Sequence, residues 1–315
     1  ELTFPIHGFE TYRSGFLSCV NTETINDAKF KVVLDYSYGS TSRIFPAILG
    51  KLNCEMIALN ANLDGTKLTK TSKEFNKSLS QLSTIVRSLS ADIGVLFDAG
   101  GEKIFLVDET GDILDTDTSL SLITLLALKA AKAAKKKGKI AVPVTASRAI
   151  DQMAETYGYE VVRTKTSARG LMEAANTDDI IFVGEPSGGY IFPEFHSAFD
   201  GMFALVKILE MLATQKVSLH KLLREIPPSI IIKERISCPW ENKGKVMRHL
   251  TEIAKDKDTV LLDGIKINSK NNWIAALPSQ DEPYFNLIAE AGTEDAARKL
   301  IERYSEMILK WQNKD

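Results

Sequence analysis

The sequence has few cysteines, and their spacing offers no way to join them. Cys19, Cys54 and Cys238 are far apart, odd in number and form no CxxC pair. This distribution argues against a disulfide framework and against a structural zinc site, and it is typical of proteins in a reducing compartment. We therefore expect a cytoplasmic protein.

Several ligand-binding patterns are also missing. The sequence has no GxGxxG run and no Walker A motif, and its four histidines lack metal-ligand spacing. Its longest apolar helical segment, residues 120–134, carries Lys129 and Lys132, so we expect no membrane span. A net charge of −2 gives no reason to expect nucleic acid or an anionic membrane surface as a partner. With 44% hydrophobic and 25% charged residues, the chain is typical of an ordinary soluble globular protein.

What the sequence does contain is a regular alternation of apolar runs and amphipathic segments. In the first block we predict strands at 31–35, 54–60, 93–98 and 104–108, and helices at 10–20, 42–52 and 74–88. In a second block we predict strands at 140–144, 160–163 and 180–183, and helices at 117–137, 146–157, 169–176 and 201–213. Alternating strands and helices are typical of βαβ units on a mostly parallel sheet. The sequence therefore predicts two tandem α/β units.

The pattern changes after Ile226-Pro227-Pro228, where two prolines stop the helix and force an extended backbone. Beyond them we predict strands at 230–237, 273–277 and 284–290, a hairpin at 261–267, and helices at 241–254 and 293–311. Strands gathered ahead of a long helix favour a small α+β domain with an antiparallel sheet. We place the domains at residues 1–116, 117–226 and 227–315.

The segment 184–195 is the first candidate site. Glu185 and Ser187 lie on a glycine-rich turn at the carboxyl end of a predicted buried strand. Open α/β sheets place ligands there, and a carboxylate beside a hydroxyl suits neighbouring sugar hydroxyls. The alternative is a strand–loop–helix corner whose glycines only turn the chain. His196, just beyond, is either a helix-cap residue or part of the site.

Two further segments carry candidate chemistry. Asp98 and Glu102 share one loop, but two acids beside Lys103 make a poor cage for Mg²⁺, which needs several oxygen ligands, so we favour a structural turn. Residues 163–169 place three cations and three hydroxyls at a helix entry, which suits phosphate. A capped helix with solvated arginines is the alternative there. The polar loop 277–283, bracketed by prolines, is either a plain turn or a site.

Taken in order, these segments resemble the α-D-phosphohexomutases, the family of phosphoglucomutases and phosphomannomutases. Residues 184–188 resemble the family's GExSG sugar loop, residues 98–103 take the place of its metal loop, and residues 278–283 resemble its PSGTEP phosphate loop. The resemblance implies two tandem phosphohexomutase-type α/β/α domains, the family's second and third, followed by a small α+β domain with an antiparallel sheet.

The resemblance also implies roles for individual residues. Glu185 and Ser187 would hold the hydroxyls of glucose or mannose phosphate, while Ser279 and its loop would hold the phosphate. Arg169 falls where the family has a basic residue near the sugar phosphate. Asp98, with Glu102, falls in the Mg²⁺ loop. The implied activity is the interconversion of hexose 1- and 6-phosphates, in hexose-phosphate and nucleotide-sugar metabolism.

Departures from the family pattern concern all three loops. In the metal loop, whose pattern is DGDxDR, Gly100 and Glu102 replace two aspartates and Lys103 replaces the arginine. In the sugar loop, Gly189 stands where a histidine is common. The phosphate loop has Leu277 in place of an arginine and Gln280-Asp281 in place of Gly-Thr. Losing an arginine fork and gaining a carboxylate should weaken phosphate binding.

The 315 residues contain no counterpart of the family's first domain, whose phosphoserine donates the phosphoryl group. We therefore expect no catalytic phosphoryl donor here and an inactive isolated chain. Segments such as Cys-Pro-Trp-Glu-x-Lys-Gly, from Cys238 to Gly244, resemble the carboxy-terminal half of bifunctional mannose-1-phosphate guanylyltransferases. We expect such a fragment, preceded by missing domains that include a sugar nucleotidyltransferase. A degenerate sugar-phosphate-binding or regulatory module is the alternative. The sequence leaves open whether copies form a homo-oligomer.

Overall fold

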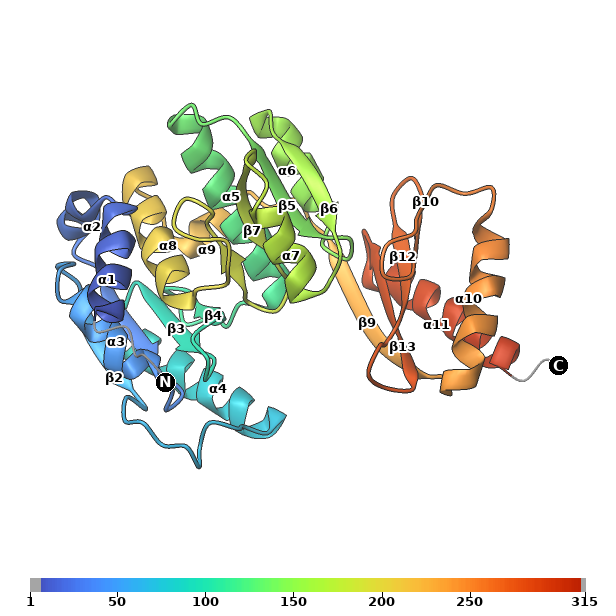
Figure 1. Ribbon diagram of the computed structural model, residues 1–315, viewed down its shortest axis with the longest axis horizontal. Coiled ribbons are helices and arrows are strands. Elements are labelled where there is room, and N and C mark those ends of the chain that lie inside the picture. The colour runs from blue at the N-terminus through green and yellow to red at the C-terminus, as the bar shows by residue number, and fades with distance from the viewer. Residues whose placement is uncertain (1–6, 313–315) are drawn as a thin grey trace.

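The protein, described here by a computed structural model of residues 7–312, has two lobes (Figure 1). The larger lobe holds everything up to α9, and the smaller lobe holds most of β9 and all later elements. In Figure 1, β9 runs from one lobe to the other. No helix among these residues is long and apolar enough to cross a membrane.

The first sheet of the larger lobe has the strand order β2-β1-β3-β4. Its strands are β1 (Lys31–Asp35), β2 (Glu55–Leu59), β3 (Ile93–Phe97) and β4 (Ile104–Val107), with β4 antiparallel to β3 and the other pairs parallel. The helices that accompany it are α1 (Gly8–Ser18), α2 (Thr22–Ala28), α3 (Thr41–Leu49) and α4 (Ser72–Leu89). All five β3 residues are buried, as expected of a strand covered on both faces.

The second sheet repeats this topology in the order β6-β5-β7-β8. Its strands are β5 (Lys139–Pro143), β6 (Glu160–Thr164), β7 (Ile180–Gly184) and β8 (Tyr190–Ile191), and β8 is again antiparallel to its neighbour. Its helices are α5 (Thr116–Ala133), α6 (Ala149–Tyr157), α7 (Ala168–Ala175), α8 (Gly201–Gln215) and the short α9 (Leu219–Leu223). The predicted repeat of two α/β units is therefore confirmed, although β8 was predicted as loop.

One hydrophobic core serves both sheets. It contains Leu34 and Phe97 from the first sheet, Ile140 from the second, and Leu125 of α5 and Phe203 of α8. Residues 119–128 of α5 are all buried, and apart from Ser119, Ser121 and Thr124 they are all apolar, as expected of a helix that is covered on every side. The two α/β units are thus packed together as one lobe.

The smaller lobe has a core of its own beneath a five-stranded antiparallel sheet. The strand order is β10-β11-β12-β13-β9, formed by β9 (Ile230–Ser237), β10 (Thr259–Val260), β11 (Ile265–Asn268), β12 (Trp273–Pro278) and β13 (Tyr284–Ala291). Helices α10 (Trp240–Ala254) and α11 (Glu294–Gln312) supply the rest of that core. The predicted α+β domain is confirmed.

Polar contacts join the two lobes. The buried Glu290 carboxylate of β13 accepts hydrogen bonds from the Ser147 hydroxyl at 2.7 Å and the Arg148 amide at 3.0 Å. The buried Lys266 amine of β11 donates to the Val144 carbonyl at 2.8 Å. This junction therefore depends on hydrogen bonds between groups that are shielded from water.

Candidate functional site

The first and second sheets each have a turn after their third strand in sequence, and these two turns contact each other. The first, residues 98–103, joins β3 to β4, and the second, residues 185–189, joins β7 to β8. Lys103 and Gly189 form an antiparallel bridge, and the Ile104 amide donates to the Gly188 carbonyl at 2.9 Å. Gly188 has φ +91°, and a Cβ there would lie 2.5 Å from the Ile104 carbonyl oxygen. Only glycine fits this close approach of two backbones.

Three side chains form a closed polar cluster at this meeting point. The Lys103 amine lies 2.9 Å from Glu185 Oε1 and 2.8 Å from the Ser187 hydroxyl, and that hydroxyl donates to Glu185 Oε1 at 2.5 Å. Glu185 is only 8% exposed, so its charge is shielded from water. A buried carboxylate needs such a partner. Lys103, expected beside Glu102, instead neutralises the sugar-loop glutamate of the other sheet.

The cluster combines every kind of polar group that a sugar ring needs. Glu185 accepts hydrogen bonds, the Ser187 hydroxyl donates and accepts, and the Lys103 amine donates. The Lys103 side chain is 32% exposed and uses two of its three donors on Ser187 and Glu185. The third donor is left for a ligand oxygen, since no other hydrogen bond from this amine occurs within residues 7–312. Neighbouring hydroxyls of a hexose would match this set.

Gly189 keeps the cluster compact. A Cβ at this position would lie 2.7 Å from Glu185 Oε1 and 2.8 Å from the Phe199 ring. Phe199 therefore occupies the space that a histidine side chain at position 189, common in the α-D-phosphohexomutases, would need. Glycine in place of histidine at position 189 is therefore consistent with the close packing of Glu185 and Phe199.

The metal loop is incomplete in its ligands. Asp98 Oδ1 accepts the Lys103 amide at 3.0 Å, which makes Asp98 the residue that closes the turn. A Cβ at Gly100 would lie 3.6 Å from Asp98 Oδ2 and 3.8 Å from Glu102 Cγ, so the position between the two acids carries no ligand atom. Because Mg²⁺ requires six well-placed oxygens, the side chains of this loop do not fit a Mg²⁺ ion held by them alone.

A different trio has metal-ligand proximity. Among residues 7–312, the one group of three His, Cys, Asp or Glu side chains with ligand atoms within 4.8 Å of one another is Asp108, Asp112 and His220. Asp108 follows β4, at the end away from the metal loop. Its Oδ1 accepts from the amides of Thr110 and Asp112, both at 2.9 Å, and its Oδ2 lies 3.1 Å from His220 Nδ1. These bonds account for the carboxylate as the cap of the turn after β4.

Two of the three cations in the segment 163–169 have protein partners. The Arg163 guanidinium donates to the carbonyls of Ala146 at 2.7 Å and Ser147 at 3.0 Å. The Arg169 side chain is exposed and pairs with Glu173 at 2.7 Å. Asp263 of the smaller lobe accepts from the Thr166 amide at 2.5 Å, so a carboxylate already occupies the entry where an anion was expected.

The loop predicted to bind phosphate is held by its own smaller lobe. The Ser279 hydroxyl accepts the amides of Asp281 at 3.3 Å and Glu282 at 3.2 Å. The buried Lys243 amine donates to the carbonyls of Ser279 and Glu282, both at 2.6 Å. Within residues 7–312, no hydrogen bond or ion pair joins this loop to the larger lobe. The structure therefore brings Glu185, Ser187 and the Asp98 loop together, and keeps Ser279 and Arg169 out of their contacts.

His196 takes a structural place near α8. Its Nε2 lies 3.2 Å from Asp200 Oδ2, which also accepts the Tyr12 hydroxyl at 2.7 Å, while Asp200 Oδ1 accepts the Phe203 amide as the cap of α8. Burial, with the Asp200 charge second, raises the pKa of Tyr12. A cavity of about 600 Å³ lies beside this group and is lined in part by Gly100, Gly101 and Glu102.

Two family models match the larger lobe. The phosphoglucomutase/phosphomannomutase α/β/α domain II model matches residues 10–111, and the domain III model matches residues 118–230. Curated relatives include the probable phosphoglucosamine mutase of Methanopyrus kandleri, 32% identical over 88% of this chain and 61% of the relative. Another is the phosphoglucosamine mutase of Methanocaldococcus jannaschii, 29% identical over 89% of this chain and 63% of the relative. The chain thus spans less than two thirds of the length of these relatives.

Solved structures have the same fold. A phosphoglucomutase/phosphomannomutase family protein from Burkholderia thailandensis matches 97% of this chain and 65% of its own with a TM-score of 0.82 and 21% identity. The Aspergillus fumigatus N-acetylphosphoglucosamine mutase, solved with GlcNAc-6P and magnesium, matches 95% of this chain and 70% of its own with a TM-score of 0.68 and 14% identity.

Proposed function

Since the chain belongs to the phosphoglucomutase/phosphomannomutase family, we propose that it supplies the sugar-binding part of a phosphohexomutase. The observation that carries this proposal is the cluster of Lys103, Glu185 and Ser187, which forms where the two α/β sheets meet. The whole enzyme would interconvert hexose 1- and 6-phosphates. In this chain the cluster binds and orients the sugar, and the phosphoryl donor lies outside these residues.

The cluster holds a sugar by exchanging its internal hydrogen bonds for bonds to the ligand. Ser187 can turn its hydroxyl from Glu185 to a sugar oxygen, while Lys103 keeps the buried carboxylate neutralised. Glu185 then accepts from sugar hydroxyls. Because water is largely excluded from Glu185, a sugar that lacks the matching hydroxyl would leave the carboxylate partly unpaired. The arrangement favours hexoses over smaller phosphorylated alcohols.

We take glucosamine phosphate as the first substrate to test, in place of the glucose or mannose phosphate expected from the sequence. The two curated relatives described above are named as phosphoglucosamine mutases, and they are 32% and 29% identical to this chain. The buried Glu185 carboxylate is chemically suited to the ammonium group of an amino sugar. Glucosamine, glucose and mannose 6-phosphates differ only around C2 and therefore separate the three assignments.

Calorimetry with these three sugar phosphates tests the binding role directly. We expect Glu185→Gln to weaken binding by about tenfold or more, because a charged acceptor becomes a neutral amide, and Ser187→Ala to weaken it by about fivefold. The matched control is Glu294→Gln, which removes an equal charge from the exposed pair with Arg298 in the smaller lobe and should leave the affinity unchanged. Absence of heat with all three sugars would reject the sugar-binding proposal.

A second candidate function is a sugar-phosphate-binding module without mutase chemistry. It is favoured by Gly100, which leaves the metal loop one carboxylate short, and by Asp281, which adds a negative charge to the loop 278–283. The two candidates separate in a protein that joins this chain to the family's phosphoserine domain. Mg²⁺-dependent interconversion that is lost on Asp98→Asn would reject the module. The guanylyltransferase partner stays a prediction.

A further inference from the structure

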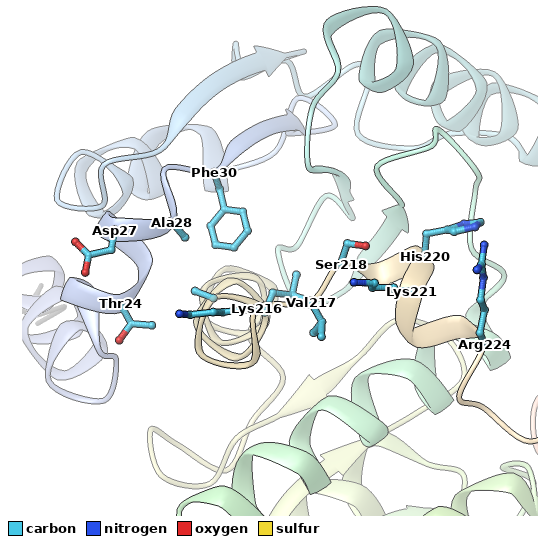
Figure 2. A pocket seen from close by; sticks show the side chains of 12 residues that line it. Thr24, Asp27, Ala28, Phe30, Lys216, Val217, Ser218, His220, Lys221 and Arg224 are labelled. Atoms are coloured by element: carbon cyan, nitrogen blue, oxygen red, sulfur yellow. The ribbon is translucent and has the colours of Figure 1, made fainter.

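A cleft separate from the sugar cluster lies where α2, the end of α8 and α9 come together (Figure 2). Its volume is about 890 Å³, which falls within the roughly 300–1,000 Å³ range of small-molecule sites. The chemistry of its wall comes from Phe30, Lys216, Ser218, His220, Lys221 and Arg224. None of the sugar-loop or metal-loop residues lines it.

The residues that line the cleft carry more positive than negative charge. Asp27 is the one acidic residue on its wall, against Lys216, Lys221 and Arg224. Within residues 7–312 these three cations make no ion pair and no side-chain hydrogen bond. Two lysines elsewhere in this lobe behave differently, since Lys129 of α5 and Lys207 of α8 each pair with a glutamate. The surplus of cations raises the local concentration of anions in the cleft.

One member of the wall is fixed in position. The Asp108 carboxylate, which is fully buried, lies 3.1 Å from His220 Nδ1, and the His220 amide donates to Glu109 at 3.2 Å. A carboxylate that holds one ring nitrogen sets the orientation of the imidazole. Figure 2 draws His220 and Arg224 at the same end of the cleft.

The spacing of the groups indicates an elongated ligand with two kinds of ends. Figure 2 shows Lys216 and the Phe30 ring on the side of α2, and His220 and Arg224 at the other end. Cations suit phosphates, and an aromatic face next to a cleft suits a nucleobase, whose stacking contributes about 1–3 kcal/mol. We propose that this cleft binds a nucleoside polyphosphate, with its phosphates on Lys221 and Arg224 and its base against Phe30.

The proposal is tested by calorimetry on this chain with ADP, pyrophosphate and adenosine as probes. We expect ADP to bind more tightly than either of its parts. The double variant Lys221→Ala/Arg224→Ala should weaken ADP binding by about tenfold or more, because two charge-assisted contacts are lost. Phe30→Leu keeps an apolar side chain in the core and should weaken ADP by about fivefold while leaving pyrophosphate unchanged.

The matched control is Lys255→Ala/Lys257→Ala, which removes the same charge from exposed positions after α10 in the other lobe. ADP affinity should survive this change, and it should also survive Glu185→Gln, which separates the cleft from the sugar cluster. Three results would each overturn the proposal. The first is the absence of any heat of binding with ADP up to about 1 mM, a concentration at which even weak sites bind. The second is an equal loss of ADP affinity in the double variants Lys221→Ala/Arg224→Ala and Lys255→Ala/Lys257→Ala. The third is pyrophosphate binding as tightly as ADP.

Discussion

The two junctions of this molecule each centre on one lysine, and the two lysines have opposite surroundings. Between the sheets, the Lys103 amine lies 2.9 Å from the Glu185 carboxylate. Between the lobes, the Lys266 amine donates to the Val144 carbonyl at 2.8 Å and lies 4.1 Å from the centre of the Trp273 ring. Lys103 contacts a full opposite charge, whereas the Lys266 amine contacts a carbonyl dipole and a π face, with no carboxylate in an ion pair with it among the described residues.

The surroundings of Lys266 shift its pKa. Burial lowers the pKa of Lys266 to about 7, and the nearby positive charge of Arg163 adds to the shift, while Asp151 and Glu290 oppose it. The sheet junction is also backed by a hydrophobic core common to both units, whereas the lobes have separate cores. The sheet junction therefore has a continuous hydrophobic core, whereas the lobe junction is polar and contains a lysine with a lowered pKa.

The largest expected effect at a single pH comes from breaking the sheet junction at Gly188. In Gly188→Ala, a Cβ would lie 2.5 Å from the Ile104 carbonyl oxygen in a residue with φ +91°. We expect a loss of about 3 kcal/mol in the free energy of unfolding, because both backbones must move and a left-handed conformation becomes strained. Urea denaturation followed by circular dichroism measures it.

Gly100→Ala is the matched control for that experiment, because it adds the same methyl group to the partner turn. Its Cβ would lie 3.6 Å from the nearest atom, Asp98 Oδ2, which is ordinary contact. The change in stability should stay within about 0.5 kcal/mol. Equal losses in the two variants would show that the turns do not differ as the structure describes.

The next effect concerns the lobe junction and its pH dependence. The folded pKa of Lys266, about 7, lies below the ordinary value of 10.5, so between these limits the unfolded state binds more protons. Stability should therefore rise with pH above about 7, by at most about 1.4 kcal/mol per pH unit. Below about 7 both states hold the proton and this contribution to the slope disappears. Urea unfolding at a series of pH values measures it.

Lys266→Met should remove this part of the rise, because the variant keeps the length of the side chain but has no proton to bind. Lys139→Met is the control. The Lys139 amine pairs with Asp179, and that hydrogen bond raises its pKa, so it stays charged throughout this range. If the free energy of unfolding of Lys266→Met depends on pH as it does in the parent chain, the prediction that Lys266 titrates at the lobe junction is wrong.

Much of the fold could be predicted because local patterns determine it. Residues 31–35 and 230–237 are strands with the predicted bounds, since continuous apolar or β-branched runs favour strands wherever they lie. The end of α5 could not be predicted from its Lys-Lys-Lys-Gly sequence. The helix ends at Ala133 and Lys135 adopts φ 52°, while Gly138 is needed where Asp179 approaches. That approach is a tertiary contact, which a local pattern does not contain.

The candidate site was predictable in its residue types and not in its pairings. The glycine-rich turn indicated Glu185 and Ser187, but their partner Lys103 lies more than 80 positions earlier in the chain. Aligning the two repeated units would have placed both turns after the third strand of each sheet. The meeting of those turns depends on how the shared core packs the sheets, and no spacing in the sequence encodes that directly.

The smallest expected effect is on Mg²⁺ affinity, when a carboxylate is added to the metal loop at the sheet junction. In Gly100→Asp, the new side chain would start 3.6 Å from Asp98 Oδ2 and 3.8 Å from Glu102 Cγ, so three carboxylates would share one turn. Because Mg²⁺ prefers several carboxylate oxygens, we expect its affinity to rise by about tenfold, measured by calorimetry. Gly100→Asn, which has nearly the same size without the charge, should bind as weakly as the parent chain. A gain in both variants would mean that loop shape, and not the missing carboxylate, limits Mg²⁺ binding.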